Sequence, residues 1–195
     1  MPYSSEHKQQ VRAKVIESAR ILFNRHGFED VTIDQVMKFA GLTRGGFYNH
    51  FKSKDALYDE AVSSFLMGRG AEWRAKAGVD TSSPTPEMAR QMILGYLSSE
   101  HLEDIDGQCP LIALPSDIAR SNPNVQSAYQ RLLEAMVSLF EQSLDKNSEE
   151  ARQKALSLAA LCVGGMILAR TLPNSDLANE VQTAARATAN QITQN

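Results

Sequence analysis

The chain has few cysteines and lacks the features that mark secreted proteins. Its 195 residues include two cysteines, Cys109 and Cys162, whose separation fits neither a disulfide framework nor a zinc site. The first residues contain no apolar segment of the kind that directs secretion. We therefore expect a reduced, cytoplasmic protein with no metal site.

The sequence also shows no group of catalytic residue types at a spacing typical of an active site. None of the four histidines has a second ligand at metal-binding spacing, and no glycine-rich phosphate loop follows a strand. Ser116 and Asp117 are neighbours, but the sequence marks no base beside them. A helical enzyme is therefore the weakest functional alternative, and we expect neither catalytic residues nor cofactors.

Alternation typical of β-strands is absent, and apolar residues recur at helical spacing instead. The most apolar stretch, residues 155–169, has about 15 residues, which is shorter than a membrane span. The sequence predicts an all-α protein of about nine helices with no membrane partner. The expected helices cover residues 7–26, 32–40, 44–50, 54–77, 86–103, 110–120, 125–140, 149–171 and 174–192.

Residues 32–54 predict a helix-turn-helix motif. Thr32 can accept from the first turn of a helix while Gln35 reaches back, which is a capping box. Gly41 can end that helix in a left-handed conformation, and Thr43 can cap the next one only two residues later. The second helix must leave at a steep angle, as a helix that enters a DNA major groove does.

This second helix has an unusual composition for one that only packs. Its two glycines each cost about 1 kcal/mol in helix propensity, and close backbone approach to DNA is a reason to keep them. Ser53 can cap the following helix, which puts Lys54 at an N-terminus suited to phosphate. A plain helical hairpin is the alternative. The predicted DNA-binding residues are Thr32, Thr43, Arg44, Gly45, Gly46, Tyr48, Asn49, His50 and Lys54.

Charge is divided unevenly along the chain. Residues 1–54 hold nine lysines and arginines against five acids, a net charge of +4, whereas the remainder carries −7. A basic N-terminal segment on an acidic body fits a DNA-contacting module. Chance segregation of solvated charges is the alternative.

Residues 40–57, Ala-Gly-Leu-Thr-Arg-Gly-Gly-Phe-Tyr-Asn-His-Phe-Lys-Ser-Lys-Asp-Ala-Leu, resemble the N-terminal signature of the TetR/AcrR family of transcriptional regulators. Residues 19–23, Gly27-Phe28 and Thr32-Ile33 match the same pattern, and the similarity covers residues 11–65. The pair Gly45-Gly46 departs from the commoner single glycine and leaves base preference open. The resemblance implies a homodimeric regulator that binds an operator in double-stranded DNA, with a repressor favoured over an activator.

The chain divides into three expected parts. Residues 1–53 form the helix-turn-helix DNA-binding domain, residues 54–77 a connecting helix in which Gly68 and Gly70 allow a bend, and residues 78–195 a helical domain for effector binding and dimerisation. Residues 78–86 are the clearest loop.

The resemblance implies a pocket for a small-molecule effector, whose identity the sequence leaves open. The candidate lining residues are flexible or aromatic, as in adaptable pockets, although plain core packing is the alternative. They are Phe65, Trp73, Met88, Met92, Tyr96, Cys109, Met136 and Met166. Cys109 precedes Pro110 at an expected helix start, where the thiol pKa falls, so a thiol-based sensor of oxidants or electrophiles is a second functional alternative.

The last two helices are predicted to form the dimer interface. Residues 155–169 are apolar on every side and must be covered on every side. In the resembling family the final two helices make the dimer contact, and burial within one subunit is the alternative. The predicted interface residues are Leu158, Cys162, Met166, Leu177, Val181, Ala184 and Thr188.

Overall fold

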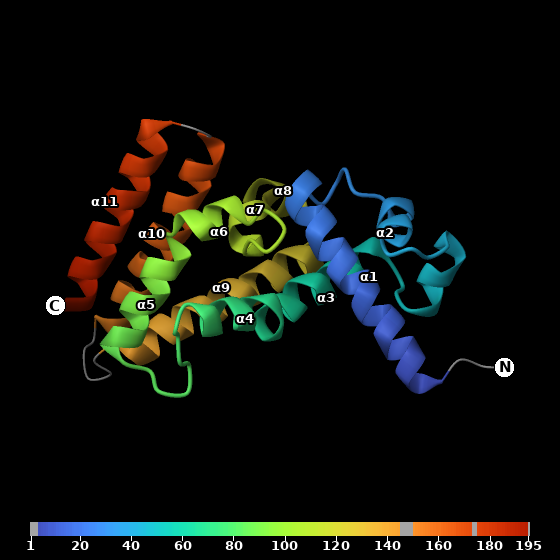
Figure 1. Cartoon of the computed structure of the whole chain (residues 1–195), viewed down its shortest axis with the longest axis horizontal. Coiled ribbons are helices and arrows are strands. Elements are labelled where there is room, and N and C mark those ends of the chain that lie inside the picture. Colours follow the sequence, from blue (N-terminus) through green and yellow to red (C-terminus); the bar gives the residue numbers. More distant parts are fainter. Residues whose placement is uncertain (1–3, 145–149, 173–174, 195) are drawn as a thin grey trace.

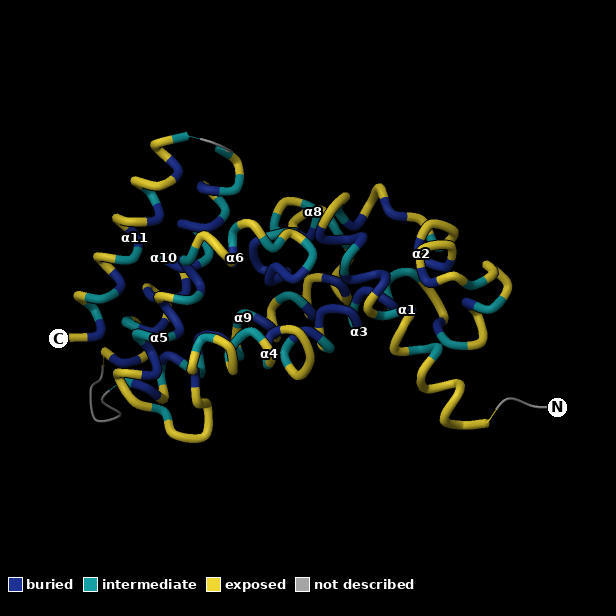
Figure 2. The backbone as a smooth tube through the Cα atoms, in the orientation of Figure 1, coloured by how far each residue is buried: buried dark blue, intermediate teal, exposed yellow. Residues whose placement is uncertain are grey.

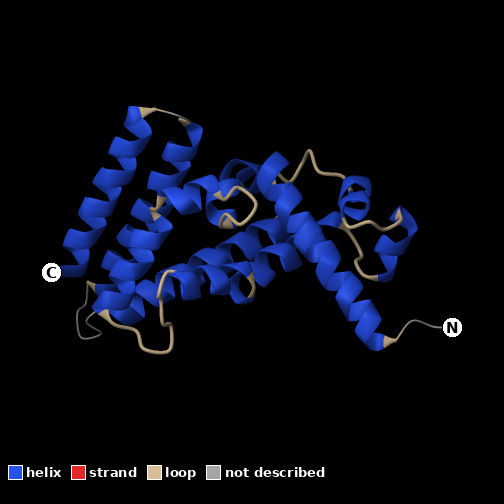
Figure 3. Cartoon of the chain, viewed as in Figure 1, coloured by secondary structure: helices blue, strands red, loops and turns tan. Residues whose placement is uncertain are grey.

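The computed structural model describes residues 4–144, 150–172 and 175–194, and across these ranges every regular element is a helix (Figure 3). The all-α prediction is confirmed. The helices are α1 (Ser5–His26), α2 (Ile33–Phe39), the 3₁₀ helix η1 (Arg44–Asn49), α3 (Lys54–Met67), α4 (Arg69–Lys76), α5 (Pro86–Tyr96), α6 (Ser99–Glu103), α7 (Pro110–Ala113), α8 (Pro115–Arg120), α9 (Pro123–Ser143), α10 (Ala151–Thr171) and α11 (Asp176–Gln194). The expected starting residues of the last two helices, 149 and 174, lie outside the described residues.

The prediction of nine helices is too low because three of them are each divided in two. The connecting helix breaks at Gly68, where an added Cβ would lie 2.9 Å from the Ser64 carbonyl oxygen. Ser98 accepts from the His101 N–H at 3.1 Å and so starts α6 separately from α5. Pro115 separates α7 from α8 because proline has no N–H to continue the helix.

The N-terminal helices and the last two helices lie at opposite ends of the molecule (Figure 1). α1, α2 and η1 form one end, and the antiparallel pair α10 and α11 forms the other. Between them α3 packs against both α1 and α9, so it connects the N-terminal unit to the body. α3 and the helices packed on it are therefore the physical connection between the two ends.

An aromatic cluster holds the N-terminal unit on the connecting helix. Phe23 of α1, Phe28 of the following loop and Tyr58 of α3 are buried, with ring centroids 5.0 to 5.6 Å apart. Phe47 of η1 is completely buried and packs 5.5 Å from Phe51. Burying a phenylalanine contributes about 2 kcal/mol, so η1 is held in place by its one inward aromatic side chain.

Candidate DNA-binding face and effector cavity

The turn before η1 is built as the sequence predicts. The Gln35 N–H donates to the Thr32 hydroxyl at 3.2 Å and the Thr32 N–H donates to the Gln35 side chain at 2.7 Å, which completes the capping box. Gly41 has φ +68°, and the Leu42 N–H closes the end of α2 on the Met37 carbonyl at 2.8 Å. These local bonds set the direction in which the chain enters η1.

η1 itself differs from the α-helix that the sequence predicts. Its six residues form a 3₁₀ helix, and Thr43 makes no side-chain capping bond. Two consecutive glycines weaken an α-helix, and 3₁₀ geometry is common in such short segments. The Thr43 hydroxyl, which is not used as a cap, is exposed.

Most of the predicted DNA-binding residues are exposed, and Figure 2 colours much of the segment around α2 as exposed. Arg44, Gly45 and Asn49 are exposed, and Tyr48 is 61% exposed despite its large apolar ring. Thr32 is also exposed, whereas Gly46 and His50 are half-buried. The outward face of η1 is therefore free to meet a large partner.

Arg44 forms an ion pair within the part of the chain that the structure describes. Its guanidinium donates to the Asp34 carboxylate at 3.0 Å, and the two side chains are 67% and 56% exposed. An exposed ion pair of this kind contributes little, about 0 to 1 kcal/mol. The guanidinium can therefore leave Asp34 and bind a base edge with little loss of stability.

The two glycines of η1 are not required by the packing of the subunit. A Cβ added at Gly45 would have no atom within 4 Å, and one at Gly46 would meet only the Met37 Cε at 3.6 Å. Neither glycine has a positive φ. The subunit therefore tolerates alanine at both positions.

Lys54 has an internal role that the sequence did not reveal. Its ammonium donates to the carbonyl oxygens of Phe28 at 2.8 Å, Val31 at 3.2 Å and Glu29 at 3.3 Å, and it lies 4.3 Å from the Phe28 ring centroid. An ammonium has three hydrogens to donate, so these carbonyls engage all of them. This differs from the predicted phosphate anchor, because a phosphate contact would require at least one of these bonds to be given up.

His50 lies in a positively charged environment. Partial burial lowers its pKa below the ordinary value, and the charges of Arg12 and Lys8 lower it further. Lys8 is exposed, whereas Arg12 pairs with Glu60 and covers the Phe51 ring at 4.5 Å. These cations on α1 add to the positive face around η1.

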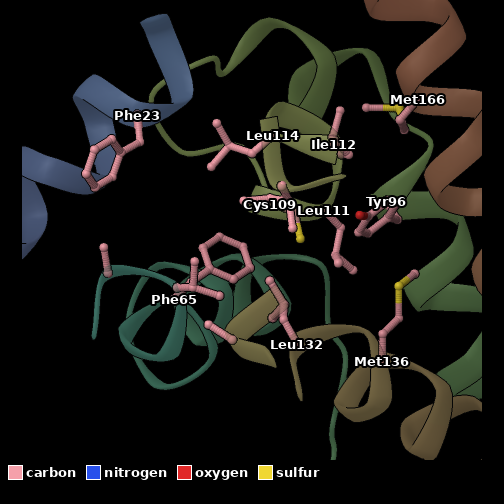
Figure 4. Packing of buried hydrophobic residues seen from close by; sticks show 14 of the residues in the cluster. Phe23, Phe65, Tyr96, Cys109, Leu111, Ile112, Leu114, Leu132, Met136 and Met166 are labelled. Carbon is pink, nitrogen blue, oxygen red and sulfur yellow. The ribbon is translucent and has the colours of Figure 1, made fainter. Parts of the chain in front are cut away.

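A cavity of about 40 Å³ lies in the body, between α3, α4, α5, α7 and α9. Six of the eight predicted pocket residues line it: Phe65, Trp73, Met92, Tyr96, Cys109 and Met136. Figure 4 shows several of these side chains converging around Cys109. The volume holds a few water molecules, so a larger ligand must displace side chains.

Two predicted pocket residues are wrong. Met88 places its sulfur 4.0 Å from the Ser143 hydroxyl, and Met166 accepts from the Gln182 side chain at 3.3 Å between α10 and α11. Both are buried core residues away from the cavity lining. The polar lining residues Arg74 and His101 carried no pocket signal in the sequence.

The prediction that a helix start lowers the pKa of Cys109 is also wrong. Cys109 is 4% exposed, and burial raises the pKa of its thiol to about 11. α7 has only four residues, so its dipole cannot offset this desolvation. A thiol that stays protonated is a poor nucleophile, which argues against the thiol-sensor alternative.

His101 joins two elements that line the cavity. Its Nδ1 lies 2.8 Å from the Tyr96 carbonyl oxygen, and its Nε2 lies 3.4 Å from the Cys109 backbone N–H. Only the neutral tautomer with hydrogen on Nδ1 satisfies both contacts. Burial is the main cause that lowers the pKa of His101, which favours this neutral form.

Acid is expected to destabilise this junction. Because the folded pKa of His101 lies below the ordinary 6.5, the unfolded chain binds the proton more readily. The stabilisation is complete above the ordinary value and is lost as the pH falls through it toward the folded pKa. Urea unfolding between about pH 7.5 and 5.5 should show a larger stability loss for the wild type than for His101→Gln. The exposed His26→Gln is the control; equal losses in all three proteins would contradict the assignment.

Polar contacts connect the cavity wall to the DNA-binding unit. The guanidinium of Arg25 in α1 donates two hydrogen bonds of 2.6 Å to the Asp106 carboxylate, and the Asn24 side chain donates to the Gln108 carbonyl oxygen at 2.8 Å. Arg170 of α10 donates to the Asn24 carbonyl at 2.9 Å and to the Gln108 side chain. The loop of residues 104–108 is bonded to α1 in this way. In the sequence it follows α6, which carries His101, and precedes Cys109, and both of these residues line the cavity.

The far end of the molecule presents an uncovered apolar face. On α10 this face consists of Leu156, Ala160, Gly164 and Leu168, spaced four residues apart; Leu156 and Leu168 are 48% and 53% exposed. On α11 buried and exposed residues alternate along the helix (Figure 2). The predicted residues of α11 lie on its outer side: Leu177, Ala184 and Thr188 are exposed and Val181 is half-buried.

The predicted interface residues of α10 are wrong. Leu158, Cys162 and Met166 are completely buried within the subunit. Close packing of α10 with α11 explains this, because a Cβ added at Gly165 would lie 2.9 Å from the Ala185 Cβ. The side of α10 that no other described helix covers is the exposed stripe of Leu156, Ala160, Gly164 and Leu168.

α10 also corrects the length argument about membranes. The helix has 21 residues and reaches a mean hydropathy of 1.4, so by length and composition alone it could cross a membrane. Buried residues make up 39% of its most apolar window. Its contacts with α11 and α9 are those of a helix packed on one side.

The fold and the exposed motif define a helix-turn-helix protein with a helical body that contains a cavity. The family model described as "Bacterial regulatory proteins, tetR family" matches residues 15–61, and the full-length fold is shared with solved structures of TetR-family regulators. Residues 15–61 thus match the N-terminal domain of the TetR family, and the fold of the chain is that of the TetR-family structures.

The chain is also similar to proteins named as transcriptional regulators. The chain is 30% identical over 94 residues to the probable HTH-type transcriptional regulator YttP of Bacillus subtilis, covering 48% of this chain and 45% of YttP, so the match spans less than half of that relative. It is 23% identical to the HTH-type transcriptional regulator AcrR of Shigella flexneri over 84% of this chain and 80% of AcrR. These relatives are named as regulators of transcription rather than as enzymes.

Solved structures extend the similarity to the whole fold. The reduced form of NemR from E. coli has a TM-score of 0.72 at 20% identity and covers 93% of this chain and 96% of its own. A TetR transcriptional regulator from Chloroflexus aurantiacus has a TM-score of 0.74 at 21% identity, with 95% and 97% covered.

Proposed function

We propose that the protein is a dimeric repressor that binds an operator in double-stranded DNA and leaves it when a small molecule occupies the cavity. The observation that carries this proposal is the outward display of Arg44, Gly45, Tyr48 and Asn49 on a motif anchored by the buried Phe47. A polar, glycine-containing segment held rigidly at one tip of the molecule suits insertion into a major groove.

The exposed groups divide by chemistry. Arg44 and Asn49 can pair with base edges, and the bare backbone of Gly45 and Gly46 lets them approach. Thr32, Thr43 and Tyr48 carry hydroxyls suited to phosphate oxygens, and His50 contributes to the positive face. The residues of the outer apolar face on α10 and α11 would pair with a second subunit, which places two reading motifs on successive turns of the duplex.

Release of DNA requires that the ligand prefers one of two arrangements of the subunit. The loop 104–108 supplies a physical connection, since it joins the cavity residues His101 and Cys109 and is bonded to Arg25 and Asn24 of α1. A ligand that moves this loop would change the position of α1, and with it the distance between the two reading motifs of a dimer.

The proposal is tested by a mobility-shift titration on DNA that flanks the gene. We expect binding that weakens steeply with salt, because phosphate contacts release counterions. Tyr48→Ala should weaken binding to all sequences, whereas Arg44→Ala should relax the preference at particular bases by about 1 to 3 kcal/mol. A substituted operator series measures this preference.

Arg90→Ala is the matched control for the loss of an arginine, because Arg90 pairs with Glu87 on α5, away from the motif. It should bind as the wild type does. Absence of a shift on every flanking fragment, or unchanged binding by both Arg44→Ala and Tyr48→Ala, would refute the proposal.

A further inference from the structure

Arg74 of α4 is a cavity-lining cation with no anionic partner. Its guanidinium is half-buried and donates to the Leu66 carbonyl oxygen at 2.6 Å, but no carboxylate of the described residues lies within ion-pair distance. Burial lowers the pKa of Arg74, the opposite of the direction at Arg69 on the same helix, where Asp104 and Glu72 pair with the guanidinium. A desolvated cation without a counterion is unfavourable.

A second donor, which has no oxygen or nitrogen acceptor among the described residues, lies in the same cavity. Tyr96 is 4% exposed, and no oxygen or nitrogen of the described residues accepts from its hydroxyl. Figure 4 shows this hydroxyl directed toward Cys109 and Leu111. Its hydrogen-bonding neighbour is the thiol of Cys109, whose sulfur is only a weak acceptor. Arg74, Tyr96 and this thiol all line the same cavity.

The remainder of the cavity has neither an acid nor a spare acceptor. Both ring nitrogens of His101 are engaged with backbone groups, and no aspartate or glutamate lines the space. Phe65, Leu132 and Met136 form an apolar wall opposite Cys109 (Figure 4). The cavity thus offers two donors and an apolar surface around them.

We propose that the effector is a small carboxylate with an apolar body, whose carboxylate accepts from Arg74 and Tyr96. A charge-assisted bond to the guanidinium supplies the missing counterion, and the unsatisfied hydroxyl gains an acceptor. A single aromatic ring or short acyl chain exceeds the 40 Å³ now open, so Met92 and Met136 must change rotamer, which unbranched methionines do readily. The role of this carboxylate as an effector rests on the proposed repressor function.

Trp73 provides the test because it is the chain's one tryptophan and it lines the cavity. Binding of benzoate and octanoate to the full-length protein would be followed by Trp73 emission and by calorimetry, each against its neutral amide, benzamide and octanamide. We expect at least one carboxylate to bind at least tenfold more tightly than its amide. Arg74→Gln should lose at least tenfold of that affinity, Tyr96→Phe several-fold, and Arg90→Gln, which alters a surface pair on α5, none.

Arg74→Lys separates charge from packing, because it keeps the cation and should regain part of the affinity lost in Arg74→Gln. Equal binding of acid and amide, full affinity in Arg74→Gln, or no binding by either acid would overturn the proposal. DNA release is measured separately by mobility shift. If a carboxylate binds through Arg74 but the protein binds no flanking DNA, the ligand class stands and the repressor function fails.

Discussion

Ala160→Arg is expected to convert the protein to monomers and to lower operator affinity by at least 100-fold. Ala160 is exposed in the middle of the α10 stripe, between Leu156 and Gly164. In a two-fold interface each substituted residue occurs twice, so two guanidinium groups would enter an apolar contact without partners. An unpaired buried charge costs several kcal/mol, which exceeds what a close helix contact of small residues can offset.

The oligomeric state is measured by sedimentation over a range of concentrations, and operator binding by titration of the same samples. Ala75→Arg is the matched control, since Ala75 is an exposed alanine on α4, far from the apolar face. The control should remain dimeric and bind DNA as the wild type does. A dimeric Ala160→Arg protein with intact operator affinity would show that the dimer uses another surface.

The helix-turn-helix motif could be predicted from sequence because its determinants are local. Thr32 and Gln35 satisfy each other's backbone groups within one turn, and Gly41 needs only its own left-handed conformation. Such contacts depend on neighbours three or four residues away, which a sequence displays directly. The 3₁₀ form of η1 differs from the prediction because Gly45 and Gly46 remove the propensity that would favour an α-helix.

The side of α10 that faces its own subunit could not be predicted from the sequence in the same way. A helix that is apolar on every side gives no periodic signal for which side meets its own subunit. The choice depends on Gly165, which admits α11 closely, and this contact spans twenty residues of sequence. Leu158, Cys162 and Met166 consequently face inward, whereas the smaller Ala160 and Gly164 lie on the outer stripe.

Only part of the cavity lining could be predicted, because the lining also depends on contacts between distant elements. Residue type identifies flexible and aromatic side chains, and six of those candidates converge. Residue type does not show that Met88 lies beside Ser143, or that Arg74 is left without a carboxylate, because both depend on distant elements. The role of Lys54 was missed likewise, since its carbonyl acceptors lie 23 to 26 residues earlier in the chain.

Gly45→Ala is expected to separate folding from DNA binding: the subunit should become no less stable while operator affinity falls at least tenfold. A Cβ at this position meets no atom of the subunit within 4 Å, and φ is not positive. Replacing glycine by alanine in a helix stabilises by about 0.5 to 1 kcal/mol, which corresponds to a rise in Tm of about 1 to 4 °C for a chain of this size. The reason for keeping glycine must therefore lie outside the subunit.

Close approach of the backbone to a base edge supplies that reason, because a methyl group would hold η1 away from the groove and lengthen every contact made by Arg44 and Asn49. Thermal unfolding and operator titration of one preparation measure both effects, and Gly46→Ala, whose Cβ meets only the flexible Met37 Cε at 3.6 Å, should behave similarly. A loss of affinity together with a lower Tm would indicate misfolding of η1. Full affinity with a raised Tm would show that DNA does not approach this backbone, and the reading surface would then have to be formed by the side chains of Tyr48 and Asn49.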